Sequence, residues 1–417
     1  MSQSTEFTLC EVPRNERKGL FPIFIVMFSF TFFVGTMFAG GKVGMSFSFW
    51  DMLWVAVVGN ILLAAYAGAL AFISARSGLS AVLMGRFCFG EVGCKLSDFA
   101  LCIAELGWYA WGTATLANSL CSWLGWQAWS AYPLMVLLGL SFCITAIVGF
   151  KGLNVLSCFS VPLMMALLVV AIIKATQHAG GWQALTDIAP LQPMDWSAAI
   201  TIVFGTFASG ATQSTNWSRL ARCGRAAVAA SFLSFFAGNG LMIIAGGWCG
   251  IVYQNADIVD VMMLQGLSLM AIVMLCLNLW TIQGPTIYNV AAAACHLMRT
   301  DRRVPVTLLS AVAGILLAVA GISELLVPFL KLLGVIIPPI GGVIMADFWG
   351  LHHGRYPRLE DVTLPNFNIR GLLAYAIGAV LSCLSPWVAP VVGIAAAAVA
   401  YIVLGLCGVN CKKGSQG

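Results

Sequence analysis

One carboxyl group lies in the middle of an apolar segment, where a charge is costly. Glu105 sits in the run Ala104-Glu105-Leu106-Gly107-Trp108-Tyr109, far from either end of its hydrophobic stretch. An ionised carboxylate at the centre of a membrane-spanning helix costs at least about 2.5 kcal/mol, so it is expected to face a cavity or a partner. Because burial favours the neutral acid, Glu105 can hold a proton at neutral pH.

Trp108 lies three residues after Glu105 and therefore on the same face of a helix. A carboxyl group and an indole on one face can hydrogen-bond to a flat heterocycle and stack on it. The alternative is that a protonated Glu105 bonds to a neighbouring helix while Trp108 packs in the core. The first interpretation predicts a site for a small aromatic ligand.

Two other segments are too polar and too rich in glycine to face lipid. Between Thr206 and Asn216, seven residues have a hydroxyl or amide group, and the run Ser29 to Thr36 leads on to Gly40-Gly41. Irregular backbone at membrane depth survives only where it lines a cavity. Helix packing explains scattered glycines, but it does not explain the seven polar groups. Paired interrupted helices in corresponding positions indicate the central site of a transporter.

The composition places these segments in a membrane protein. Of 417 residues, 60% are hydrophobic and 9% are charged, with a mean hydropathy of +0.93, whereas soluble chains have about 25% charged residues. So few charges exclude a soluble enzyme or a nucleic-acid-binding protein. A membrane-spanning helix needs roughly 20 apolar residues. Twelve stretches qualify, centred near residues 30, 62, 110, 140, 163, 207, 240, 280, 312, 335, 378 and 397.

The basic residues predict the orientation, because Lys and Arg concentrate in cytoplasmic loops. With the N-terminus inside, 18 of the 21 basic residues fall on the cytoplasmic side, and an even number of crossings places both termini there. The cytoplasmic set is Arg14, Arg17, Lys18, Arg76, Arg86, Lys95, Lys151, Arg219, Arg222, Arg225, Arg299, Arg302, Arg303, Arg355, Arg358, Arg370, Lys412 and Lys413.

Other kinds of chemistry lack their motifs. The sequence has no G-x-x-x-x-G-K-[ST] loop, so ATP does not drive this protein directly. Cysteines such as Cys102 and Cys143 stand singly in apolar runs and are expected to be small buried hydrophobic residues. No His/Cys cluster indicates a metal or haem, and no Ser or Cys nucleophile has a recognisable base. We therefore expect neither enzyme activity nor a cofactor.

Several motifs resemble one family along nearly the whole chain. They are Arg17-Lys18-Gly19, Gly40-Gly41, Arg86-Phe87-Cys88-Phe89-Gly90, Gly107-Trp108, Asn278-Leu279-Trp280-Thr281 and the most specific, Ile337-Pro338-Pro339-Ile340-Gly341-Gly342-Val343-Ile344-Met345-Ala346-Asp347. These stretches are similar to the nucleobase–cation symporters of the purine–cytosine permease family, above all its bacterial cytosine permeases.

The resemblance implies an all-α polytopic membrane protein with twelve transmembrane helices. Helices 1–5 (residues 20–175) and 6–10 (195–349) would form a 5+5 inverted repeat with broken helices 1 and 6, followed by helices 11–12 (370–408). Residues 1–19 and 409–417 would be cytoplasmic tails. The implied function is cation-coupled import of a nucleobase, most of all cytosine, across the bacterial inner membrane. The protein would act as a monomer in lipid, with no nucleic-acid partner.

The resemblance also implies two sets of site residues. The base would lie between Trp108 and Phe207, and Thr206, Ser209 and Gly210 would offer hydroxyl and backbone groups to its edge. Glu105 and Phe33 complete this substrate set. A coupling sodium would bind between helices 1 and 8, at Ser29, Phe32, Asn278, Thr281 and Ile282.

Two residues depart from the family pattern. Glu105 stands where the cytosine permeases have Gln, and Ile282 stands where they have a second Thr. A protonated Glu105 would replace the amide and keep cytosine as substrate, whereas an ionised one would accept from adjacent N–H donors, as guanine or isocytosine presents them. A hydroxymethylpyrimidine, another purine or allantoin stays an alternative. Ile282 removes an oxygen that a hard cation needs. The coupling ion is therefore either a proton held by Glu105 or sodium.

Overall fold

The computed structural model describes residues 10–148 and 150–407, without the side chains of residues 145, 148 and 150–159. Residues 1–9 of the expected N-terminal tail and the expected C-terminal tail at 409–417, with Lys412 and Lys413, lie outside the described residues. The described chain is helical apart from loops and one isolated bridge between Lys18 and Ala221.

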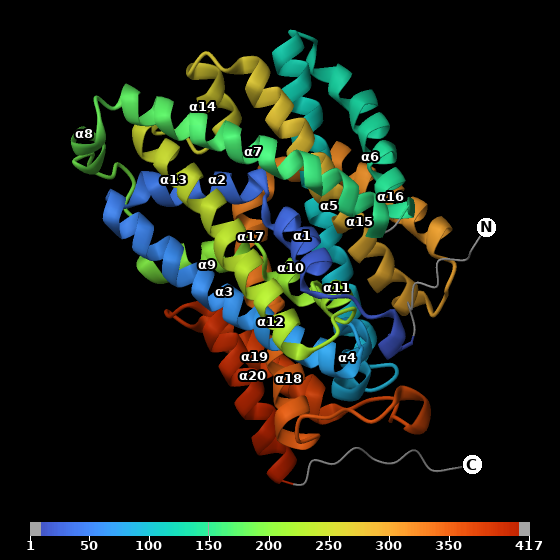
Figure 1. Ribbon diagram of the computed structural model, residues 1–417. Coiled ribbons are helices and arrows are strands. Elements are labelled where there is room, and N and C mark those ends of the chain that lie inside the picture. Colours follow the sequence, from blue (N-terminus) through green and yellow to red (C-terminus); the bar gives the residue numbers. More distant parts are fainter. Residues whose placement is uncertain (1–9, 149, 408–417) are drawn as a thin grey trace.

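The helices form one bundle (Figure 1). In chain order they are α1 Leu20–Thr31, α2 Val34–Ser46, α3 Phe49–Ser77, α4 Ala81–Phe89, α5 Cys94–Leu124, α6 Ala131–Val148, α7 Phe150–His178, α8 Trp182–Thr186, α9 Trp196–Gly205, α10 Ala208–Gln213, α11 Thr215–Ser218, α12 Gly224–Leu233, α13 Gly240–Tyr253, α14 Ile258–Leu264, α15 Ser268–Met298, α16 Arg303–Val319, α17 Leu326–Ile336, α18 Pro338–Ala346, α19 Ile369–Leu384 and α20 Ala389–Leu406. Two π-helical segments, η3 Ser234–Asn239 and η5 Asp347–Leu351, follow α12 and α18.

Many of these helices are long and apolar enough to cross a membrane, as the composition predicts. Within the described ranges, six single helical stretches qualify by length and hydropathy, and α1 with α2 makes a seventh candidate bent by 53°. Eleven of the twelve predicted centres lie in helical segments, and the twelfth, residue 207, lies at the break between α9 and α10. The chain is therefore a multi-pass helical membrane protein, and the number twelve stays a prediction.

Both predicted breaks are present. Phe32 and Phe33 leave helical geometry between α1 and α2, and Thr206 and Phe207 separate α9 from α10. Each break removes backbone hydrogen bonds at a buried position, where every polar group needs another partner. At the first break, the hydroxyl of Thr31 supplies one link, because it lies 2.9 Å from the carbonyl oxygen of Ser234 in η3.

Glycine allows α2 to pack directly against α13. A Cβ atom on Gly44 would lie 2.2 Å from the carbonyl oxygen of Gly247, and one on Gly246 would lie 2.0 Å from the carbonyl oxygen of Met37. Only glycine permits such an approach of two backbones, as in other small-residue contacts between membrane helices. This contact fixes the half-helix that follows the first break.

The last two helices form a pair at one side of the bundle, next to α18 (Figure 1). The buried carboxylate of Asp347 anchors them. It accepts a hydrogen bond of 2.5 Å from the hydroxyl of Tyr401 in α20 and one of 2.9 Å from that of Tyr356. The family-like motif at the end of α18 therefore holds the C-terminal helices in place.

Candidate functional site

One cavity lies between the two breaks, α5 and α15. Each of its ten lining residues is buried. All seven substrate residues nominated from the sequence are among them: Phe33, Glu105, Trp108, Thr206, Phe207, Ser209 and Gly210. The structure thus brings together side chains from three segments that are far apart in the chain.

The cavity is small. It leaves about 10 Å³ for the centre of a water-sized sphere, which is about what a single water molecule needs. A pyrimidine ring does not fit into this volume. A ring-shaped ligand requires the surrounding aromatic side chains to move apart.

Phe33 lies between the two aromatic residues that are expected to hold a base. Its ring is edge-on to Trp108, with ring centroids 5.1 Å apart, and edge-on to Phe207 at 6.2 Å. Phe30 packs edge-on against Phe207 from the other side at 5.3 Å. In this conformation the ring of Phe33 takes up space between Trp108 and Phe207, so stacking of a base on both requires Phe33 to move.

Only one carboxyl oxygen of Glu105 accepts a hydrogen bond from an amide side chain. Its Oε2 accepts a long hydrogen bond of 3.5 Å from Nδ2 of Asn289, whose Oδ1 accepts one of 3.0 Å from Nδ2 of Asn216. The side chain of Ser209 interacts with the carboxyl group, and apart from this mutual contact neither Glu105 Oε1 nor Ser209 Oγ has a hydrogen-bond partner among the described residues. A buried polar atom without a partner costs about 1–3 kcal/mol. These two atoms on the cavity are therefore suited to bind a polar ligand edge.

The two other residues at the second break are more constrained. The hydroxyl of Thr206 donates to the carbonyl oxygen of Val203 at 2.7 Å and accepts from Nδ2 of Asn239 at 3.1 Å. A Cβ atom on Gly210 would lie 2.8 Å from the ring of Phe207. Thr206 therefore supports the break through its side chain, and Gly210 allows the ring of Phe207 to lie against the backbone.

Sequence reasoning missed three residues that border the cavity or its carboxyl group. Thr286 of α15 and Phe30 of α1 line the cavity beside Ile282, and Asn289 bonds Glu105. Positions 282, 286 and 289 are spaced by four and three residues and so share one helical face. That spacing is the signal which could have identified Thr286 and Asn289.

The five residues of the predicted sodium site lie partly together. Nδ2 of Asn278 donates to the carbonyl oxygen of Phe32 at 2.7 Å, and the N–H of Phe32 donates to the carbonyl oxygen of Ser29 at 3.2 Å. The hydroxyl of Thr281 donates to the carbonyl oxygen of Asn278 at 2.8 Å. Ile282 instead lines the cavity at Glu105. Hydrogen bonds therefore link Ser29, Phe32, Asn278 and Thr281, and Ile282 supplies no side-chain oxygen.

The structure also brings together three potential metal ligands that form no motif in the sequence. Ligand atoms of Cys94, Asp98 and His296 lie within 4.8 Å of one another. Nδ1 of His296 lies 2.6 Å from a carboxylate oxygen of Asp98, and both residues are buried. This short contact links α5 to α15 about two helical turns before Glu105, and it explains how the buried Asp98 is tolerated.

Comparisons with known proteins identify the family and the fold. Residues 11–407 match the family described as permeases for cytosine/purines, uracil, thiamine and allantoin. The cytosine permease of Escherichia coli strain K12 is 32% identical over 406 residues, which cover 97% of this chain and 95% of that protein. Two solved structures of Mhp1, a nucleobase-cation-symport-1 family transporter, share the fold. The closed form with bromovinylhydantoin bound has a TM-score of 0.85 at 18% identity, covering 96% of this chain and 95% of Mhp1. The inward-facing form has a TM-score of 0.82 at 20% identity, covering 94% and 92%.

Proposed function

We propose that this protein imports cytosine by cation-coupled alternating access. The chain belongs to the family of permeases for cytosine, purines, uracil, thiamine and allantoin. Members of this family are membrane transporters and not enzymes. In our proposal the protein works as a monomer in the bacterial inner membrane, with both termini in the cytoplasm. The basic residues of the loops support this orientation.

The observation that supports a base as substrate is the pairing of aromatic rings with an unpartnered carboxyl oxygen in one buried cavity. Trp108 and Phe207 offer ring faces once Phe33 has moved, and each aromatic contact adds about 0.5–1.5 kcal/mol beyond the burial of area. Apart from their contact with each other, Glu105 Oε1 and Ser209 Oγ lack partners among the described residues. A base edge with both donors and acceptors would satisfy them, and a wrong edge would leave them unpaired.

Cytosine is the substrate that a protonated Glu105 would select. A neutral carboxyl group donates and accepts, as an amide does, and can pair with the ring nitrogen and amino group of cytosine. The similarity to the cytosine permease of E. coli supports this choice. An ionised Glu105 only accepts, which would favour guanine. Hydroxymethylpyrimidine and allantoin are the further alternatives.

The coupling ion is sodium or a proton, and each has its own residues. Sodium would bind the oxygens of Ser29, Phe32, Asn278 and Thr281, and a proton would bind Glu105. An ion drives transport only through its different affinity for the outward-open and inward-open states. Asn278 bonds Phe32 at the first break, so sodium bound there would act on α2, the half-helix that follows Phe33.

Equilibrium binding to the purified protein tests the substrate assignment. Labelled cytosine should bind, unlabelled cytosine should displace it at the lowest concentration, and guanine, hydroxymethylpyrimidine and allantoin should displace it more weakly. Replacing Trp108 by Ala should weaken binding roughly two- to tenfold, while the exposed Trp129 provides a matched control as Trp129→Ala. Stronger displacement by another base would replace cytosine as the substrate. Equal affinities of the two tryptophan variants would exclude this cavity as the site.

A further inference from the structure

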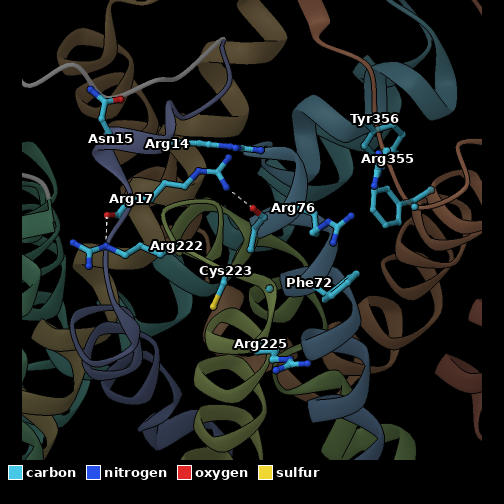
Figure 2. Close-up of a pocket in the computed structure, with 14 residues that line it drawn as sticks. Arg14, Asn15, Arg17, Phe72, Arg76, Arg222, Cys223, Arg225, Arg355 and Tyr356 are labelled. Atoms are coloured by element: carbon cyan, nitrogen blue, oxygen red, sulfur yellow. Dashed lines mark hydrogen bonds between the residues drawn. The ribbon is translucent and has the colours of Figure 1, made fainter.

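A second, much larger cavity lies at the end of the bundle where the segment before α1, the end of α3, the start of α12 and the loop after η5 meet (Figure 2). It has a volume of about 1240 Å³ and shares no residue with the cavity at Glu105. None of its fourteen lining residues is acidic. Six are arginines: Arg14, Arg17, Arg76, Arg222, Arg225 and Arg355.

The bias of basic residues toward one side of a membrane explains why arginines occur at this end. It does not explain why six of them, from four separate segments, surround one hollow with no acidic residue in its lining. Figure 2 shows their side chains around this common space. We name it the arginine cavity.

Part of the arginine cavity is built by hydrogen bonds. Nη1 of Arg17 donates to the carbonyl oxygen of Ala75 at 2.6 Å, which joins the N-terminal segment to α3. Nε of Arg222 donates to the carbonyl oxygen of Arg17 at 3.2 Å, which joins it to the segment before α12. These bonds hold two of the guanidinium groups against backbone, and so fix the shape of the wall.

The other charges are available to a ligand. The side chains of Arg14, Arg225 and Arg355 are exposed and form no hydrogen bond or ion pair with residues in the described ranges. Burial, and next the charge of Arg14, lower the pKa of Arg17 from its ordinary value, while Glu11 opposes this shift. Gathering these like charges is unfavourable, and a bound anion would relieve the repulsion.

Two features indicate the kind of anion. The ten-residue helix α12 begins at the cavity wall and has no side-chain cap on its first turn. The N–H groups at its positive end would therefore favour a bound anion. Trp349, 45% exposed, packs on the wall residues Phe72 and Phe348 with ring centroids 6.4 and 5.7 Å apart. Exposed tryptophan is typical of the membrane–water interface. A lipid headgroup is therefore one candidate source of the anion.

We propose that the arginine cavity binds a group with two phosphates. Six arginines and a volume of about 1240 Å³ exceed what a single phosphate needs. Basic pockets between membrane helices are known to bind the headgroup of cardiolipin, which has two separate phosphates. The source is either the headgroup of cardiolipin or a soluble diphosphate. The occupant joins the N-terminal segment, α3, α12 and the loop after η5.

Native mass spectrometry of the full-length protein, titrated with cardiolipin and with phosphatidylethanolamine, tests this proposal. The variant Arg225→Gln/Arg355→Gln removes two charges of the cavity. The matched control Arg302→Gln/Arg358→Gln removes two exposed arginines outside it. We expect wild type and control to retain cardiolipin in preference to phosphatidylethanolamine. The cavity variant should bind cardiolipin at least tenfold more weakly, since each basic residue contributes roughly fivefold.

A second arm distinguishes the sources. Pyrophosphate should raise the Tm of the lipid-free wild-type protein, and displacement of cardiolipin by pyrophosphate would show that both occupy the same site. A Tm shift by pyrophosphate without preferential binding of cardiolipin would assign the cavity to a soluble diphosphate. If the wild-type protein retains cardiolipin preferentially, equal loss of cardiolipin in the cavity and control variants, or no loss in either, would overturn the proposal. A wild-type protein that shows no preference for cardiolipin and whose Tm does not change with pyrophosphate would also overturn it.

Discussion

Asn278 of α15 bonds the backbone of Phe32 at the first helix break. Its Nδ2 donates to the carbonyl oxygen of Phe32 at 2.7 Å, while its Oδ1 accepts from the N–H of Val34 at 2.9 Å. A helix end leaves such groups without partners in their own helix. One side chain from another helix therefore satisfies both sides of the break and ties α2 to α15.

Replacing Asn278 by Ala should destabilise the protein. Two buried backbone groups would lose their partners, at about 1–3 kcal/mol each. We expect a clearly lower Tm of the detergent-purified variant and a loss of transport. The exposed Asn118 is a matched control, and the Tm of Asn118→Ala should equal that of the wild-type protein. If the two variants melted together, the side chain would not support the break.

Gly44→Ala should disrupt the contact between α2 and α13. The added methyl group would meet the carbonyl oxygen of Gly247 at 2.2 Å, so the two backbones must separate, and overpacking of this kind costs typically 1–3 kcal/mol. In α3, Gly68→Ala adds the same methyl group where the nearest atom is 3.6 Å away. Thermal unfolding should show a lower Tm for the first variant only; a Tm loss of similar size for Gly68→Ala would point to helix glycine content rather than to this contact.

His296→Ala should be more harmful than the removal of both members of its pair. The single variant leaves the buried carboxyl group of Asp98 without its 2.6 Å partner, and breaking a buried pair costs about 3–5 kcal/mol. Asp98→Ala/His296→Ala removes the stranded group as well, so its Tm should lie above that of the single variant. The reverse order would show that the two residues do not stabilise the fold as a pair.

Glu105→Gln separates the two coupling hypotheses. The amide keeps hydrogen-bonding capacity but cannot release a proton. If Glu105 transfers the coupling proton, cytosine uptake by the variant should no longer depend on pH, and binding should persist. The outcome against proton coupling through Glu105 is a pH profile of uptake that the substitution leaves unchanged.

The local features of the fold could be predicted from the sequence because they depend on residue type. Runs of glycine and hydroxyl residues indicated both helix breaks, and the breaks at Phe32–Phe33 and at Thr206–Phe207 confirm this. The grouping of residues around one cavity came from family resemblance, because single-sequence patterns contain no contacts between distant helices. Whether those residues bind substrate stays a prediction.

Side-chain packing decided what the sequence could not predict. The position of Phe33 between Trp108 and Phe207 depends on how three rings fill a small space. The side chain of Ile282 borders the base cavity, although its neighbour Thr281 joins the sodium residues. The pair of Asp98 and His296 joins residues 198 positions apart. Each of these contacts depends on the tertiary arrangement of helices rather than on local pattern.

The most direct test of cation-coupled cytosine import is uptake of labelled cytosine into proteoliposomes, with a sodium gradient and a pH gradient imposed separately. Accumulation above equilibrium under one gradient is the result we predict: sodium-driven uptake would assign coupling to the residues around Asn278, and proton-driven uptake would assign it to Glu105. Folded protein that accumulates no cytosine under either gradient would contradict the proposed function.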